Sequence, residues 1–98
     1  MAIGLLATIT VREGMNEEFE HAFMDLAEEV RANEPGNHFY ALHRSGDDPQ
    51  VYKVMEQYAS QEALDAHSKS DHFREANKIL AGLVAVAPEV ELLPAVTR

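Results

Sequence analysis

One strongly amphipathic segment restricts the fold of this chain more than any other feature. Between residues 16 and 34, apolar side chains recur at helical spacing while charged side chains occupy the opposite face. The apolar set is Phe19, Ala22, Phe23, Leu26, Ala27 and Val30. Such a helix needs an apolar surface to cover. The chain supplies an aliphatic run over residues 2–11 and two strand-like runs over 38–45 and 51–58, joined by the turn cluster at 46–49.

The remaining segments complete a recognisable order of elements. Two short helices are predicted over residues 60–68 and 71–83, and a last strand over 90–96. The order is therefore β-α-β-β-α-α-β, the split βαβ pattern of ferredoxin-like folds in the α+β class. We expect a single domain over residues 1–98, in which helices cover one face of an antiparallel sheet.

Composition excludes several classes of partner. The formal net charge is −9 and the chain has only 8 Lys and Arg residues, so nucleic acid and anionic membranes would be repelled. The apolar run from Ile3 to Ile9 is too short to span a bilayer. The chain has no cysteine, which excludes disulfides and thiolate metal sites and favours a reducing, cytoplasmic location.

The predicted strands carry large apolar side chains on both of their faces. Phe39 alternates with Tyr40 in the second strand, and Met55 alternates with Val54 in the third. A sheet with one wet face should show cleaner alternation, because only its covered face needs apolar residues. We therefore expect a homodimer in which two protomers pack sheet to sheet.

Two histidines lie on the apolar faces of the two short helices. With Ser60 as the N-cap, His67 shares a helical face with Ala63 and Leu64. With Ser70 or Asp71 as the next N-cap, His72 begins an apolar stripe, whose further members are Ala76, Ile79 and Leu83. A single inward histidine is more often structural than catalytic. Two imidazoles that face one shared apolar pocket nevertheless suggest chemistry.

The stretch from Glu56 to Phe73 reads Glu-x-Tyr-x-Ser-x-Glu-Ala-Leu-x-Ala-His-x-x-Ser-x-His-Phe. This motif is the most specific part of a resemblance to the antibiotic biosynthesis monooxygenase family that covers essentially the whole chain. Further similarities are Gly14, the turn Glu34-Pro35-Gly36, Tyr40, and Arg44-Ser45 before Asp47-Asp48-Pro49. The resemblance implies a dimeric α/β barrel with a pocket between sheet and helices in each protomer. It also implies oxygenation of quinols or anthrones without a cofactor, haem degradation, or isomerisation of a small phosphorylated sugar.

Comparison of positions narrows these activities. Haem-degrading members need an Asn, a Trp and an axial His where this chain has Ala7, His67 and Asn77, so haem degradation is not expected. Polyketide-oxidising members use a Trp and a Tyr where this chain has Tyr58 and Leu64. Tyr58 keeps an aromatic side chain at the first position, whereas Leu64 lacks the phenol of the second. Quinol oxygenation therefore stays open, but the specific antibiotic-pathway chemistry is in doubt.

The first hypothesis is a monooxygenase that uses O₂ and no cofactor. His67 or His72 would be the general base that deprotonates an electron-rich aromatic, because imidazole titrates near neutral pH. Side chains expected to bind the substrate are the four aromatic walls Tyr40, Tyr58, Phe39 and Phe73, with Asn77 or Arg74 holding a developing oxyanion.

Two other hypotheses stay open. An isomerase of a small enolisable metabolite could use the same histidine without O₂. A phosphorylated substrate would then need basic side chains, for which Lys53, Lys69, Arg74 and Lys78 are the candidates near this region. The protein could instead be a dimer that binds a small ligand without catalysis.

Neither a metal site nor a nucleotide cofactor is expected from the spacing of residues. His38 and His43 are five residues apart on one strand and therefore point to opposite faces. His67 and His72 are separated by a helix break, and no carboxylate lies beside them at a standard ligand spacing. The chain also has no glycine pattern of a phosphate-binding loop.

Overall fold

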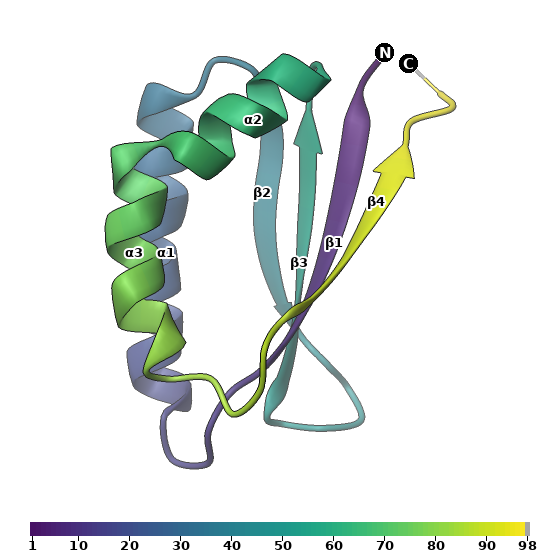
Figure 1. Ribbon diagram of the computed structural model, residues 1–98. Helices are drawn as coiled ribbons and strands as arrows, with labels where there is room; N and C mark the ends of the chain where they lie inside the picture. Colours follow the sequence, from purple (N-terminus) through teal and green to yellow (C-terminus); the bar gives the residue numbers. More distant parts are fainter. Residues whose placement is uncertain (98) are drawn as a thin grey trace.

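The computed structural model describes residues 1–97 and shows four strands and three helices (Figure 1). The elements are β1 (Ile3–Thr10), α1 (Asn16–Asn33), β2 (Asn37–Arg44), β3 (Val51–Tyr58), α2 (Gln61–Lys69), α3 (Asp71–Ala81) and β4 (Glu89–Pro94). The predicted order of elements is confirmed.

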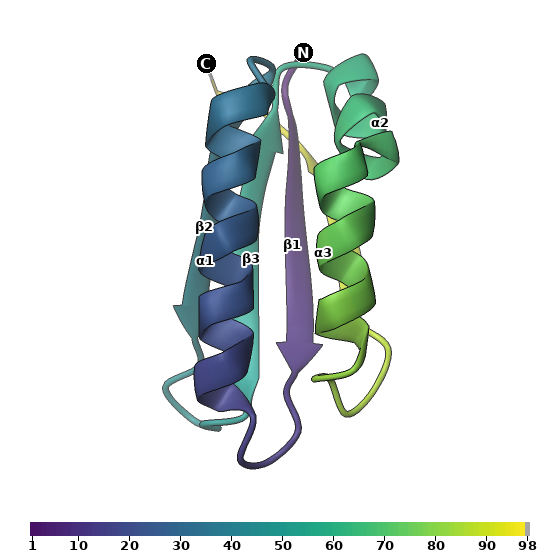
Figure 2. The same cartoon turned by 90° about the vertical axis from the view of Figure 1, so that its left-hand side faces the viewer.

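The strands form one antiparallel sheet in the order β2-β3-β1-β4. The helices α1 and α3 lie side by side over the same face of this sheet, as Figure 2 shows from the helix side. This arrangement is the α+β, ferredoxin-like split βαβ fold expected from the sequence.

The core forms where α1 meets the central strands. The inward residues of α1 are those of the predicted apolar face, and four of them are buried: Phe19, Phe23, Leu26 and Val30. They pack on Tyr52 and Val54 of β3 and on Ala7 and Ile9 of β1. Since successive strand residues alternate between faces, these residues mark the helix-covered side of the sheet.

One helix end differs from the prediction: α3 ends at Ala81, before Leu83. Met15 occupies the N-cap of α1, while the side-chain amide of Asn16 donates hydrogen bonds to the Pro49 carbonyl and the Tyr52 hydroxyl. Ile79 is 62% exposed, whereas Leu80 packs in the core.

The other face of the sheet has no helix over it (Figure 1). Phe39, Met55 and Leu93 are on this face and are 46%, 48% and 44% exposed. Among the described residues, no helix has the length and hydropathy that crossing a bilayer requires.

Candidate functional site

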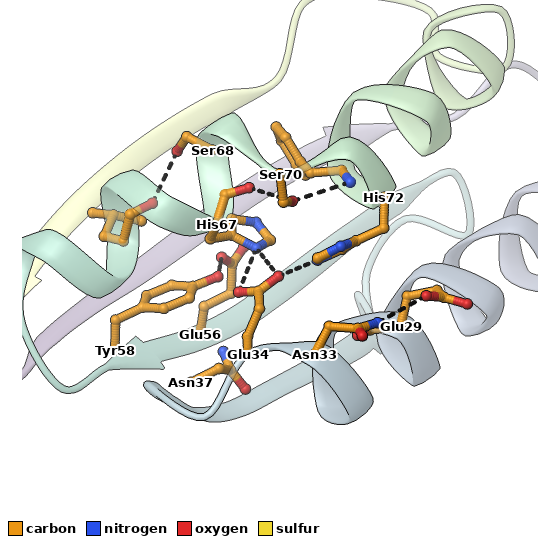
Figure 3. A network of polar contacts seen from close by, with 12 residues as sticks. Glu29, Asn33, Glu34, Asn37, Glu56, Tyr58, His67, Ser68, Ser70 and His72 are labelled. Atoms are coloured by element: carbon orange, nitrogen blue, oxygen red, sulfur yellow. Dashed lines mark hydrogen bonds and ion pairs between the residues drawn. The ribbon is translucent and has the colours of Figure 1, made fainter.

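A carboxylate from the end of α1 joins the two histidines predicted from the sequence. His67 Nδ1 lies 3.0 Å from both carboxylate oxygens of Glu34, and His72 Nε2 contacts Glu34 Oε2. Figure 3 shows the Glu34 carboxylate between the two imidazole rings. We refer to Glu34, His67 and His72 as the Glu–His–His cluster.

The junction between α2 and α3 fixes the relative positions of the two histidines. Ser60 caps α2 by accepting a hydrogen bond from the Ala63 amide, which confirms the predicted N-cap. Ser70 caps α3 by accepting from the Phe73 amide, and its hydroxyl also donates to the His67 carbonyl at 2.7 Å. One serine therefore ends the helix that carries His67 and begins the helix that carries His72 (Figure 3).

A tight turn places Glu34. Its amide donates to the Val30 carbonyl at the end of α1, and its carbonyl accepts from the Asn37 amide at the start of β2, both at 3.0 Å. Gly36 in this turn lies against α2, since a Cβ at this position would sit 2.6 Å from the Ala63 Cβ. The turn can approach the helix that carries His67 only because residue 36 has no side chain.

Aromatic rings enclose His67. The Tyr40, Tyr58 and Phe73 rings have their centroids 5.3, 5.2 and 4.6 Å from the centroid of the imidazole. His67 is 3% exposed. Burial lowers the pKa of His67 because it disfavours the charged ring, and the hydrogen bond with Glu34 opposes this shift.

The contacts determine where hydrogens lie when Glu34 is ionised. A carboxylate only accepts hydrogen bonds, so His67 Nδ1 and His72 Nε2 both carry a hydrogen. In a neutral His72 ring the other nitrogen, Nδ1, is then free to take up a proton. Glu34 would stabilise the imidazolium that forms, which is the function of a carboxylate beside a catalytic histidine.

A second buried carboxyl group, that of Glu56, lies near the Glu34 carboxylate, and Figure 3 shows it together with its partner Tyr58. Glu56 is 6% exposed, and its Oε1 accepts a hydrogen bond from the Tyr58 hydroxyl at 2.7 Å. Burial raises the pKa of Glu56 to about 7, the Tyr58 hydrogen bond partly offsets this, and the nearby Glu34 charge adds to it. Burial also raises the pKa of the Tyr58 phenol above its usual value, so Tyr58 is the donor in this pair.

A groove on the surface lies between α1 and α3 and has a volume of about 950 Å³. Its apolar lining is Ala22, Leu26, Ala76 and Ile79, and its charged lining is Asp25, Glu29, Asp71, Glu75 and Lys78. His72 also lines this groove, whereas His67 does not. We expected both imidazoles to face one pocket under the helices. Instead, aromatic rings fill the space around His67, and the groove reaches only His72.

The other predicted site residues divide into two groups. Tyr40, Tyr58 and Phe73 contact His67, as described above. Phe39 does not, because it lies in β2 next to Tyr40 and therefore points to the outer face of the sheet. Arg74 and Asn77 are exposed on α3, and neither lines the groove. Both residues lie in the predicted helix, but their side chains do not face the groove as an oxyanion-binding role there would require.

Sequence reasoning did not assign a role to Glu34 or Glu56. Glu34 belongs to the Glu34-Pro35-Gly36 turn and Glu56 begins the most specific motif, so both were noted as part of the resemblance. No carboxylate lies at a standard ligand spacing from the two histidines in the sequence. The fold brings Glu34 to them from 33 residues before His67 and 38 residues before His72.

The whole region that carries this site is similar in sequence to a known protein family. The sequence model described as "Antibiotic biosynthesis monooxygenase" matches residues 2–79, which include all three members of the Glu–His–His cluster. The chain belongs to the antibiotic biosynthesis monooxygenase family. A comparison with curated proteins finds no significant match.

Solved structures agree with this assignment. A provisionally assigned antibiotic biosynthesis monooxygenase from Caulobacter crescentus CB15 is 45% identical, with a TM-score of 0.96 over 98% of this chain and 91% of the other. A conserved protein from Methanosarcina mazei Go1 is 26% identical, with a TM-score of 0.89 over 95% and 91%. A family protein from Nitrosomonas europaea, at 21% identity and a TM-score of 0.92 over 97% and 90%, shares the fold.

Proposed function

We propose that this protein is a cofactor-independent monooxygenase that oxidises a small, electron-rich aromatic such as a quinol or an anthrone. The observation that carries the proposal is that His72 belongs to the Glu–His–His cluster and also lines the groove between α1 and α3. Membership of the family supports monooxygenation as the reaction class. The substrate, the base and the participation of O₂ are our proposal.

His72 is the general base in this mechanism. With Nε2–H donating to Glu34, His72 Nδ1 takes the hydroxyl proton of a substrate in the groove. Glu34 stabilises the resulting imidazolium, and His67 holds Glu34 in place from the buried side. His67 is thus a positioning residue, since aromatic rings surround it and it does not line the groove.

The deprotonated aromatic supplies the electrons. It transfers one electron to O₂, and the resulting radicals combine at a ring carbon to give a peroxide anion. The peroxide takes the proton back from His72, which regenerates the neutral base, and the hydroperoxide then loses water. One oxygen atom remains in the product as a carbonyl, the other leaves as water, and the substrate loses four electrons in total. The protein needs to supply only a base, an apolar surface and a fixed orientation of the ring.

The groove disfavours one alternative. An isomerase of a phosphorylated metabolite would require cationic side chains at the substrate. Among residues 1–97, the groove is lined by four carboxylates and by Lys78 as its one Lys or Arg. A neutral aromatic fits the apolar strip of Ala22, Leu26, Ala76 and Ile79 better. An uncharged enolisable metabolite, or a ligand that is bound without turnover, would give no O₂ uptake.

Oxygen consumption with a panel of naphthoquinols and anthrones tests the proposal. We expect His72→Asn to lower the rate above autoxidation by about 10²- to 10⁴-fold, the usual contribution of a positioned base. His21→Asn, on the exposed face of α1, is the matched control and should leave the rate unchanged. An undiminished rate in the His72→Asn variant would remove this histidine from the mechanism.

We also propose that the protein is a homodimer joined through the outer face of its sheet, and that it is cytoplasmic. Exposed Phe39, Met55 and Leu93 on a face without helices support the dimer. The absence of cysteine from the sequence supports a reducing compartment.

A further inference from the structure

We propose that the Glu–His–His cluster is also a binding site for a divalent transition-metal ion, with Zn²⁺ as the best match. The ion would bind to one Glu34 oxygen, His67 Nδ1 and His72 Nε2. This inference does not rest on the proposed oxygenation, because it concerns the donor atoms of the cluster and not the reaction.

The geometry is close to that of a bound ion. One donor atom from each of the three residues can be chosen so that all three lie within 4.8 Å of one another. Donors around a tetrahedral Zn²⁺ with bonds of about 2.0–2.1 Å are separated by about 3.3 Å. The Glu34 and His67 atoms are already 3.0 Å apart. Side-chain movements of only about an ångström would therefore bring the three donor atoms to coordination distance from one ion.

The donor types select the class of ion. Two imidazole nitrogens and one carboxylate oxygen are typical ligands of Zn²⁺ and related first-row ions, whereas Ca²⁺ and Mg²⁺ prefer oxygen alone. Three protein ligands leave a fourth position for water. Because His72 lines the groove between α1 and α3, an ion could enter from that side.

Burial and charge favour an ion at this place. The Glu34, His67 and His72 side chains are 9%, 4% and 16% exposed. A buried carboxylate needs a nearby positive charge or several hydrogen bonds. An ion would provide this charge, and the Tyr40, Tyr58 and Phe73 rings around His67 would keep competing water away from one side.

Metal binding and base function would exclude each other. A neutral imidazole that binds Zn²⁺ through Nε2 keeps its proton on Nδ1 and cannot accept another. His72 with bound Zn²⁺ therefore cannot deprotonate a substrate, so the ion would act as an inhibitor of the metal-free reaction proposed above.

Direct binding of Zn²⁺ and Co²⁺ to the chelator-treated full chain tests this site. Titration calorimetry should give one ion per chain, and Co²⁺ should give the visible absorption of a tetrahedral complex. We expect Glu34→Gln, His67→Asn and His72→Asn each to weaken Zn²⁺ binding by about tenfold or more, and to remove the Co²⁺ spectrum. Circular dichroism checks folding. His72 is more exposed than His67, at 16% against 4%, so the His72 variant gives a readout even if the His67 variant does not fold.

The control addresses adventitious surface binding. His21 is exposed on α1 near Glu17 and Asp25 in sequence, so His21→Asn removes a surface imidazole that has carboxylates nearby and should leave binding unchanged. Absence of binding at 100-fold excess of ion, binding that survives in His72→Asn and Glu34→Gln, or binding lost in His21→Asn would each overturn the inference. None of these results would contradict the proposed metal-free O₂ uptake. Conversely, absence of O₂ uptake would contradict the oxygenase proposal but not the ion site.

Discussion

Glu34 Oε2 lies 3.0 Å from His67 Nδ1, although 33 residues separate the two in the chain. The contact joins the end of α1 to α2, and a further contact from the same oxygen to His72 brings in α3. One carboxylate thus connects all three helices of the layer that covers the sheet. Its loss should affect both the stability of this layer and the chemistry of the histidines.

Glu34→Gln tests the contribution of this carboxylate to stability. The amide keeps the shape but is uncharged, and its NH₂ group replaces one of the two oxygens that face His67 Nδ1, so the buried hydrogen bonds to the histidines weaken. We expect the free energy of unfolding to fall by about 1–3 kcal/mol in urea titrations at pH 7. Glu75→Gln is the control, since that side chain is 73% exposed and should change the value by less than about 0.5 kcal/mol. Equal stability of the Glu34 variant and the wild type would contradict a structural role.

Glu56 should make stability depend on pH. Its pKa is about 7 in the folded protein, against an ordinary value of 4.5. Between these values the folded protein binds more protons at Glu56 than the unfolded chain does, so the free energy of unfolding falls as pH rises. The stabilisation is fully present below pH 4.5 and is lost above pH 7. At about 1.4 kcal/mol per pH unit, the difference between 4.5 and about 7 gives a loss of at most about 3.5 kcal/mol.

Glu56→Gln isolates this effect from that of other titrating groups. The amide cannot lose a proton, yet it can still accept the Tyr58 hydrogen bond. From pH 5 to pH 8, the stability of the variant minus that of the wild type should therefore rise by about 1–3 kcal/mol, measured in urea. Glu75→Gln should show no such trend. An identical difference at both pH values would mean that Glu56 is ionised throughout this range.

The sequence predicted the parts of the site that depend on local signals. The amphipathic pattern located α1, and the serine caps Ser60 and Ser70 located the starts of α2 and α3. Together these placed His67 and His72 on either side of one helix break. Each inference needed only residues within a few positions of one another, so no knowledge of tertiary packing was required.

The parts that depend on packing could not be predicted. Glu34 reaches the histidines because Gly36 lets its turn approach α2, a contact that no periodicity encodes. Phe39 was assigned to the pocket although alternation in β2 directs it to the opposite face from Tyr40. The groove lies between two helices, and its position follows from how far apart α1 and α3 pack.

Gly36→Ala tests the approach of the turn to α2. The new methyl group would lie 2.6 Å from the Ala63 Cβ, which is too close without movement of the backbone. We expect a loss of about 1–3 kcal/mol in the free energy of unfolding, the usual effect of overpacking. The double variant Gly36→Ala, Ala63→Gly removes the clash. Its loss in the free energy of unfolding should therefore be smaller than the sum of the losses of the two single variants. If the changes in the free energy of unfolding are strictly additive in this double-mutant cycle, residues 36 and 63 are not in steric contact.

Met55→Lys tests the proposed dimer. Met55 is 48% exposed on the outer face of the sheet, near Phe39, where a partner sheet would bury it. A lysine there would place a charge in an apolar interface, so we expect the dissociation constant to rise by about tenfold or more, equivalent to 1.4 kcal/mol. Met24→Lys is the matched control, because Met24 is 51% exposed but lies on α1, on the other side of the molecule. Sedimentation velocity at micromolar concentration should show a dimer for the wild type and the Met24 variant and a shift to monomer for the Met55 variant. A monomeric wild type, or equal dissociation of both variants, would exclude sheet-to-sheet pairing.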